Sequence, residues 1–208
     1  MRSVLVVNPK GGSGKTTLAT NLAGGLAGQG EEVYLWDLDR QQSSLTWLGM
    51  RPAHVPAVHR LDRRDSDALA DRGKGWLVMD SPAGFHGKNL SHAIKVASRI
   101  LVPIQPSVFD MAATSAFLQA IREEKAVRKS RTFIGIVGVR VDPRTRAAAT
   151  LEAFLGQFEL PILGYLRDSQ IYPNAAFNGL SIFDLPHYLT ERDLQQWAPV
   201  LEWVRNAD

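Results

Sequence analysis

Short runs of consecutive apolar residues recur along the chain and alternate with longer stretches in which apolar residues fall at helical spacing. A run of about four to six apolar residues, rich in Val and Ile, is typical of a strand that is buried on both faces. In residues 16–27 leucine and alanine lie three and four positions apart, and Gly28 and Gly30 follow as a stop signal. We expect strands at residues 4–7, 33–36, 76–79, 100–104, 133–139 and 161–166, and helices at 16–27, 111–127 and 191–204.

Strands that alternate with helices predict a parallel sheet that is covered on both faces. We therefore predict the α/β class, as a single doubly wound, mostly parallel sheet that takes in residues 1–208 as one domain. Residues 49–75 are rich in arginine and aspartate, and we expect a short strand and a helix there. Ligands of such sheets bind beyond the carboxyl ends of the strands, so the residues that follow each strand are the candidates for a site.

The composition restricts the function classes. The 208 residues suffice for one α/β domain with a well-buried sheet. The absence of cysteine excludes a disulfide scaffold, a thiolate metal site and an iron–sulfur cluster. No stretch approaches the roughly 18 apolar residues of a membrane span. The first strand begins at once, so we expect neither a signal peptide nor a helix-turn-helix domain ahead of it, and we expect a cytoplasmic protein.

Positive charge is concentrated in one part of the chain. Residues 122–146 hold eight of the 24 basic residues and three of the 21 acidic ones, a net charge of +5, and the rest of the chain carries −2. A basic region on a near-neutral body is expected of a protein that binds a phosphate backbone. A solvated helix face gives the same pattern, so charge alone leaves both interpretations open.

The segment between the first strand and the first helix has the residues of a phosphate-binding loop. Backbone N–H groups of a glycine-rich turn at a helix N-terminus form an anion-binding nest. Lys15 can reach the β- and γ-phosphates of a nucleotide, and the Thr16 hydroxyl can ligate Mg²⁺. The general pattern G-x-x-x-x-G-K-[ST] fails at Pro9, but the stricter pattern K-G-G-x-G-K-T-T is fully matched. We therefore predict that ATP and Mg²⁺ bind here, through Lys10, Gly11, Gly12, Ser13, Gly14, Lys15, Thr16 and Thr17.

Further segments support a resemblance that begins with residues 8–17. They are Asp-Leu-Asp-Arg-Gln-Gln-Ser at 37–43, Met-Asp-Ser-Pro-Ala-Gly at 79–84, Pro-Ile-Gln-Pro-Ser-Val-Phe-Asp at 103–110, and the looser stretch 166–184. Over nearly its whole length the chain resembles the deviant-Walker-A ATPases, and within them the ParA partition family. The resemblance implies an ATPase that dimerises when it binds ATP and hydrolyses ATP slowly until a partner protein stimulates it.

The resemblance also implies roles for individual residues. Lys10 would cross the dimer interface to the nucleotide of the partner subunit, and Asp39 would orient the attacking water. With Lys15 these two form the expected catalytic set, in which positioning and charge stabilisation do most of the work. Asp80 would hold Mg²⁺ through water beside Thr16. For Asp37, a switch role and a capping role stay open.

One position departs from the family pattern. Proline commonly follows the second aspartate in the family, whereas this chain has Arg40. The change should loosen the segment and places an arginine near the expected γ-phosphate. We therefore expect an altered rate of hydrolysis without a change in the site itself.

The ParA resemblance further implies that the ATP-bound dimer binds DNA without sequence preference and is then nucleoid-associated. Such a dimer would partition or position a cargo, a plasmid, chromosome or protein complex, through a ParB-like or other adaptor protein. No aromatic residue interleaves with the arginines near residue 144, which favours phosphate contact over base stacking. Arg140 could instead approach the adenine. We expect the DNA contacts to come from Arg140, Arg144, Arg146 and Arg167, helped by the basic helix end at 125–129.

Two other functions fit the same loop. A MinD-like membrane ATPase ends in an amphipathic helix with a basic polar face. The last helix here is more acidic than basic and is interrupted by Pro199, so we expect it to dock on its own sheet and not on a membrane. A metabolic ATP-dependent enzyme of the same superfamily, such as a synthetase or a tyrosine kinase, would need a substrate motif or a tyrosine-rich tail. We find neither in the sequence.

Overall fold

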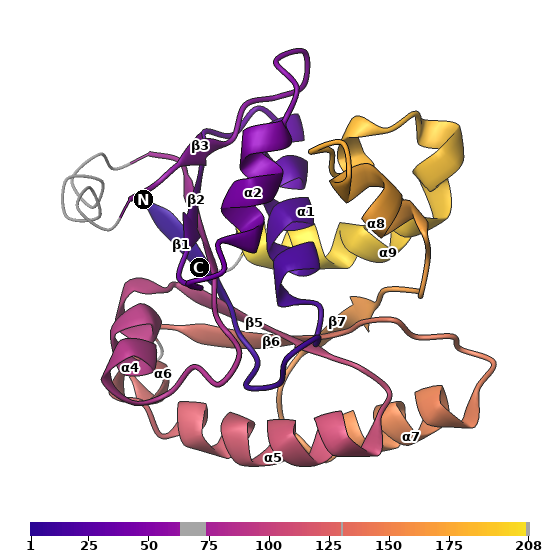
Figure 1. Cartoon of the computed structure of the whole chain (residues 1–208). Coiled ribbons are helices and arrows are strands. Elements are labelled where there is room, and N and C mark those ends of the chain that lie inside the picture. The colour runs from indigo at the N-terminus through magenta and orange to yellow at the C-terminus, as the bar shows by residue number, and fades with distance from the viewer. Residues whose placement is uncertain (63–73, 130, 207–208) are drawn as a thin grey trace.

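The computed structural model describes residues 1–62, 74–129 and 131–206. Within these ranges the chain forms one sheet of seven strands in the order β3-β2-β4-β1-β5-β6-β7 (Figure 1). Each neighbouring pair is parallel. The predicted α/β class and parallel sheet are therefore confirmed. The strands are β1 (Arg2–Val6), β2 (Val33–Asp37), β3 (His59–Arg60), β4 (Trp76–Asp80), β5 (Arg99–Ile104), β6 (Phe133–Gly138) and β7 (Ile162–Tyr165).

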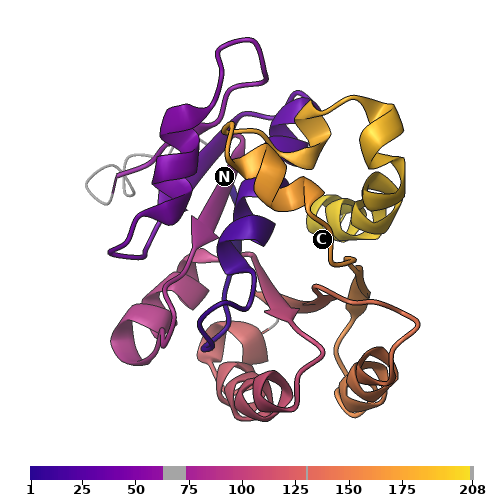
Figure 2. The same cartoon turned by 45° about the vertical axis from the view of Figure 1, so that its right-hand side comes forward.

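Helices cover both faces of this sheet, as the views in Figures 1 and 2 show. In Figure 2 the yellow C-terminal helix lies on the same side as the indigo first helix, while the helices from about residue 87 to residue 155 lie in the lower part of the view. One face carries α1 (Lys15–Gly28), α2 (Ser43–Met50), α8 (Ile171–Ala176), the 3₁₀ turn η2 (Ile182–Asp184) and α9 (His187–Asn206). The other carries α4 (Gly87–Val96), α5 (Val108–Arg122), α6 (Lys125–Arg128) and α7 (Arg146–Leu155).

The apolar runs are explained by the two layers of helices. In β1, Val4 and Val6 point into the cluster under α1 and α9, whereas Leu5 packs with α4 and α5 on the other face. Successive side chains of a strand point to opposite faces, so a strand covered on both faces must be apolar at every position. These residues of β1 are completely buried.

The sequence pattern located the strands better than the helices. The predicted strands agree with the observed ones within one or two residues, and a short strand, β3, does lie in the stretch 49–75. The helix that we expected in that stretch is not seen in its described part, and residues 63–73 lie outside the described residues. Four helices, α2, α4, α7 and α8, were not predicted. The helix expected at 111–127 is divided into α5 and α6, because Glu124 has an extended backbone (ψ 135°).

The C-terminal helix corrects one expectation and confirms another. Pro199 does not interrupt the helix but lies inside α9, which continues to Asn206. Its apolar face is buried against the sheet, with Trp197 completely inaccessible, as expected of a helix docked on its own domain. Among the residues that the structure describes, none of the helices has the length and apolar character that a membrane span requires.

Candidate nucleotide-binding site

The glycine-rich loop joins the end of β1 to the start of α1. Gly12 and Gly14 have positive φ angles of 73° and 85°, which glycine adopts at little cost and other residues do not. A Cβ at Gly14 would also lie only 3.4 Å from the Val139 side chain. The helix begins directly after it at Lys15. The first N–H groups of a helix have no intrahelical partner, so the loop and the helix end together offer donors to an anion.

Two polar side chains attach this loop to β5 and the segment after it. Asn8 is completely buried; its Nδ2 donates to the Pro103 carbonyl (2.8 Å), and its Oδ1 accepts from the Lys10 N–H (2.8 Å). The Gln105 side chain donates to the carbonyl of Gly12. We assigned neither residue a role from the sequence. Their partners lie 95 and 93 positions away, so no local pattern could have shown the contacts.

Lys15 lies over the loop where the phosphates would bind. Its ammonium donates to the Lys10 carbonyl (2.7 Å) and to Ser13 Oγ (3.3 Å), and the residue is only 7% exposed. Burial lowers the pKa of Lys15, and the charges of Asp80 and Asp39 oppose that shift. A cation so poorly hydrated interacts strongly with an anionic ligand.

Asp80 and Thr16 form the part of the site that suits a metal ion. Asp80 ends β4, is 1% exposed, and its Oδ1 has no hydrogen-bond partner among the described residues. Burial raises the pKa of Asp80 to about 7, a shift that a hydrogen bond from Thr16 opposes and the charge of Asp37 increases. Carboxylate and hydroxyl oxygens are the ligands that Mg²⁺ prefers. The unpaired oxygen beside the threonine hydroxyl therefore fits Mg²⁺, held directly or through water.

Asp37 has a capping role. It ends β2 beside Asp80, with which it is in register. Its Oδ1 accepts from the Asp39 N–H (2.9 Å), and its Oδ2 accepts from the Ser44 N–H (3.0 Å), the Ser44 hydroxyl (2.7 Å) and the Leu45 N–H (3.3 Å). Asp37 thus fixes the start of α2 and the turn that carries Asp39. Asp39 itself uses Oδ1 to accept from the N–H of Gln41 (3.0 Å).

Lys10 extends from the loop towards the start of α5. Its ammonium lies 5.6 Å from the centroid of the Phe109 ring, a cation–π distance. Phe109 is 76% exposed and the adjacent Val108 is 70% exposed. Unlike the buried Lys15, Lys10 is partly exposed, at the edge of the phosphate loop and next to this exposed apolar pair.

A cavity of about 540 Å³ extends from the loop between α1, α2 and α8. That volume is ordinary for a small-molecule site. Its walls include Gly14 and Thr16 beside the loop, and the aromatic residues Trp47 from α2 and Tyr172 from α8. Trp197 donates its indole N–H to the Tyr172 oxygen (3.1 Å), and burial raises the Tyr172 pKa. A cavity that adjoins the phosphate loop and has flat aromatic side chains in its walls suits a nucleotide, whose phosphates and base differ in the same way.

The four arginines expected to contact DNA are not in one place. Arg140 and Arg167 line the nucleotide cavity, and Arg167 is held by two hydrogen bonds to the buried Asp193 (2.9 and 2.7 Å). Arg144 and Arg146 lie outside the cavity, next to the start of α7, and are exposed. Arg144 is paired with Asp142 (2.9 Å), which reduces the charge that it presents to a ligand.

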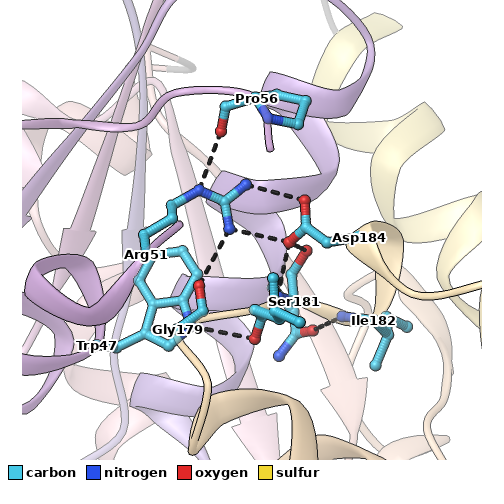
Figure 3. Close-up of polar contacts among 9 residues, drawn as sticks. Trp47, Arg51, Pro56, Gly179, Ser181, Ile182 and Asp184 are labelled. Atoms are coloured by element: carbon cyan, nitrogen blue, oxygen red, sulfur yellow. Dashed lines mark hydrogen bonds and ion pairs between the residues drawn. The ribbon is translucent and has the colours of Figure 1, made fainter. Parts of the chain in front are cut away.

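One wall of the cavity is fixed by a buried ion pair at the end of α2 (Figure 3). Arg51 donates to both oxygens of Asp184 (2.9 and 3.0 Å), and the two side chains are only 4% and 1% exposed. The guanidinium also lies 5.1 Å from the ring centroid of Trp47, whose indole N–H donates to the Leu180 carbonyl (3.1 Å). This pair joins α2 to η2 and was not recognised from the sequence, because its partners are 133 positions apart.

Comparisons with known proteins agree with this geometry. The family model of the CobQ/CobB/MinD/ParA nucleotide binding domain matches residues 4–182. The maintenance of carboxysome distribution protein A of Gloeobacter kilaueensis is 31% identical over 186 residues, covering 87% of this chain and 83% of that protein. The chromosome-partitioning ATPase Soj of Thermus thermophilus is 28% identical over 189 residues, covering 74% and 76%.

Among solved structures, the MinD cell division protein of Aquifex aeolicus superimposes with a TM-score of 0.76 at 18% identity, over 100% of this chain and 98% of that one. An ATP complex of a Cyanothece McdA variant gives 0.72 at 18% identity, over 100% and 97%. At such identities the superpositions establish the fold alone. The family match over residues 4–182 establishes more: this chain belongs to the CobQ/CobB/MinD/ParA family of nucleotide-binding domains.

Proposed function

We propose that this chain is an Mg²⁺-dependent ATPase that dimerises when it binds ATP, binds DNA without sequence preference, and positions a cargo through an adaptor protein. The observation that carries the proposal is the pair of lysines in one loop. Lys15 is buried over the phosphate site, whereas Lys10 is only partly buried, at the edge of the same loop. A second lysine is unnecessary for binding phosphate within one subunit and suits contact with a second nucleotide across an interface.

The residues of the site divide the work of phosphoryl transfer. The N–H groups of the loop and the Lys15 ammonium hold the phosphates, and the cavity between α2 and α8 receives the base. Mg²⁺, when bound by Thr16 and Asp80, neutralises phosphate charge and so favours attack on phosphorus. Asp39, on the turn that Asp37 fixes, orients the attacking water. Lys10 of the partner subunit adds a positive charge to the transition state.

The positioning part of the proposal is supported by relatives and by the arrangement of α9. Similar proteins are described as a chromosome-partitioning ATPase and as proteins that maintain carboxysome distribution. The apolar residues in the second half of α9, Trp197, Val200, Leu201 and Val204, are buried in the core of this domain, so they are not free to enter a lipid surface; Tyr188 and Leu189 at its start are exposed. We accordingly propose DNA, and not a membrane, as the surface on which the ATP-bound dimer collects, which would make it nucleoid-associated.

The test is the assembly state. Light scattering should show a monomer without nucleotide and a dimer with ATP and Mg²⁺. Lys10→Ala should bind ATP but stay monomeric, because it lacks the charge that crosses the interface. Lys74→Ala is the matched control: it removes an exposed lysine at the amino end of β4, far from the loop, and should dimerise normally. Equal dimerisation of Lys10→Ala and wild type would remove the basis of the proposal.

A further inference from the structure

The structure divides the basic segment of residues 122–146 into two separate surfaces. Arg144 and Arg146 follow the carboxyl end of β6, whereas α6 precedes the amino end of the same strand. Helix α6 packs against both α4 and α5 at that end of the sheet, as Figure 1 shows. The two basic groups therefore lie at opposite ends of the domain and cannot form one patch.

The corner at α6, which we call the α6 corner, is the more strongly charged surface. It consists of six exposed cations and two glutamates, a net charge of +4. None of the six forms an ion pair within the described part of the chain, whereas Arg144 and Arg167 do. The cations are Lys95, Arg122, Lys125, Arg128, Lys129 and Arg131, and the glutamates are Glu123 and Glu124.

Side-chain and backbone hydrogen bonds hold the α6 corner in shape. The Ser91 hydroxyl of α4 donates to Glu124 Oε1 (2.6 Å), which occupies one of the two local carboxylates and joins α4 to α6. The Thr132 hydroxyl donates to the Ala97 carbonyl (2.8 Å), and the Arg131 N–H donates to the Ala126 carbonyl (3.0 Å). These hydrogen bonds thus hold in place the backbone that carries the cations.

We infer that the α6 corner is the surface that holds duplex DNA by its phosphates. The inference rests on the proposed DNA binding and specifies which residues carry it. Unpaired lysines and arginines on flexible stems bind phosphates without reading sequence. A lipid surface would require apolar side chains that insert. Ala126 and Val127, the apolar residues of α6, pack against the core, and the apolar residues exposed beside the cations, Val96 and Phe133, are only 39% and 38% exposed.

The position of the α6 corner leaves DNA and nucleotide free to bind together. The phosphate loop lies at the carboxyl ends of the strands, and the 15-residue α5 runs from Val108, beside that loop, to Arg122 in the corner. At 1.5 Å per residue this helix separates the two by about 22 Å. A dimer formed through the phosphate loop would carry its two α6 corners away from that interface, so DNA and the partner subunit do not compete for one surface.

The experiment compares two double variants that remove the same charge. Lys125→Gln with Arg128→Gln lowers the net charge of the α6 corner from +4 to +2. Arg144→Gln with Arg146→Gln removes the same charge from the other basic group, at the other end of the sheet. Binding to a fluorescent duplex of arbitrary sequence is measured over a salt series, with Mg²⁺ and a non-hydrolysable ATP analogue. Light scattering and a thermal melt verify that each variant is folded and dimerises.

The α6 variant should bind DNA about tenfold more weakly or worse, and the slope of log K against log salt should fall by about 0.9 for each phosphate contact that is lost. The Arg144/Arg146 variant should lose clearly less affinity than the α6 variant. If the Arg144/Arg146 variant loses the affinity and the α6 variant does not, the surface is wrongly assigned while DNA binding stands. If wild type binds no DNA with the analogue, the proposed function fails and this inference with it. Binding of wild type to anionic phosphatidylserine vesicles in place of DNA would likewise overturn it.

Discussion

Replacing Arg51 by methionine tests whether the buried ion pair at the end of α2 stabilises the walls of the nucleotide cavity. The guanidinium makes four hydrogen bonds, two to Asp184, one to the Gly179 carbonyl and one to the Pro56 carbonyl. Methionine keeps most of the aliphatic stem against Trp47 but removes every donor. The variant therefore isolates the charge and the hydrogen bonds from the packing.

The expected loss of stability arises because Asp184 stays buried after its partner is removed. Removing one partner of a buried ion pair costs about 3 to 5 kcal/mol, because the other charge stays buried without compensation. Asp184 would still accept from the Ser181 N–H (2.7 Å) and hydroxyl (2.6 Å), which places the expected loss near the lower end of that range. For a domain of this size each kcal/mol lowers Tm by about 2 to 4 °C, so Tm should fall by roughly 6 °C or more.

Urea unfolding measures the change in the free energy of unfolding, and Arg60→Met is the control. Arg60 pairs with Asp62 at the surface, where the side chains are 55% and 53% exposed, and losing such a pair should cost about 0 to 1 kcal/mol. A double-mutant cycle with Asp184→Ala then gives the coupling of the pair. If Arg51→Met costs less than about 1 kcal/mol, or if the coupling is near zero, the ion pair does not stabilise this wall.

Three further predictions concern the nucleotide site. Lys15→Gln should still fold but should bind ATP at least about tenfold more weakly, because one charge-assisted contact with the phosphates is lost. An unchanged ATP affinity by calorimetry would contradict the assignment of the phosphate site. Asp39→Ala should still bind ATP and dimerise but hydrolyse it orders of magnitude more slowly, measured as phosphate release; a normal rate would rule out its role with water. Because burial raises the pKa of Asp80 to about 7, its protonated form stabilises the nucleotide-free fold below about pH 4, and this stabilisation is lost as the pH rises through 7. Asp80→Asn should therefore be more stable than wild type at pH 8, and the difference should shrink towards pH 5. If the urea midpoints of variant and wild type differ by the same amount at pH 8 and at pH 5, the buried carboxyl does not have this effect.

The local sequence determined the sheet and the phosphate loop. A strand covered on both faces must be apolar at each position, so β1, β2, β4, β5 and β6 are visible as uninterrupted apolar runs. The loop is equally local, because Gly12, Gly14, Lys15 and Thr16 act within a few residues of one another. The position of Asp80 was predictable for a related reason: it ends a strand whose carboxyl end lies at the same edge of the sheet as the loop.

The helices were less predictable because several bury only a few side chains. Helix α2 has Ser44 and Trp47 as its buried residues, and α8 has Tyr172 and Ala175, too few for a recognisable period. Its neighbours and not its own pattern hold α2 in place, through the cap from Asp37 at one end and the Arg51 ion pair at the other.

The tertiary structure alone decided which charged residues act together. Eight basic residues appear as one group in the sequence, but a strand of about 20 Å, β6, separates α6 from Arg144 and Arg146. The sequence proposed Arg167 as a DNA contact without showing that Asp193, 26 positions away, pairs with it. Charge is visible in a sequence, but whether a charge is paired or free depends on which distant segments the fold brings within about 4 Å of it.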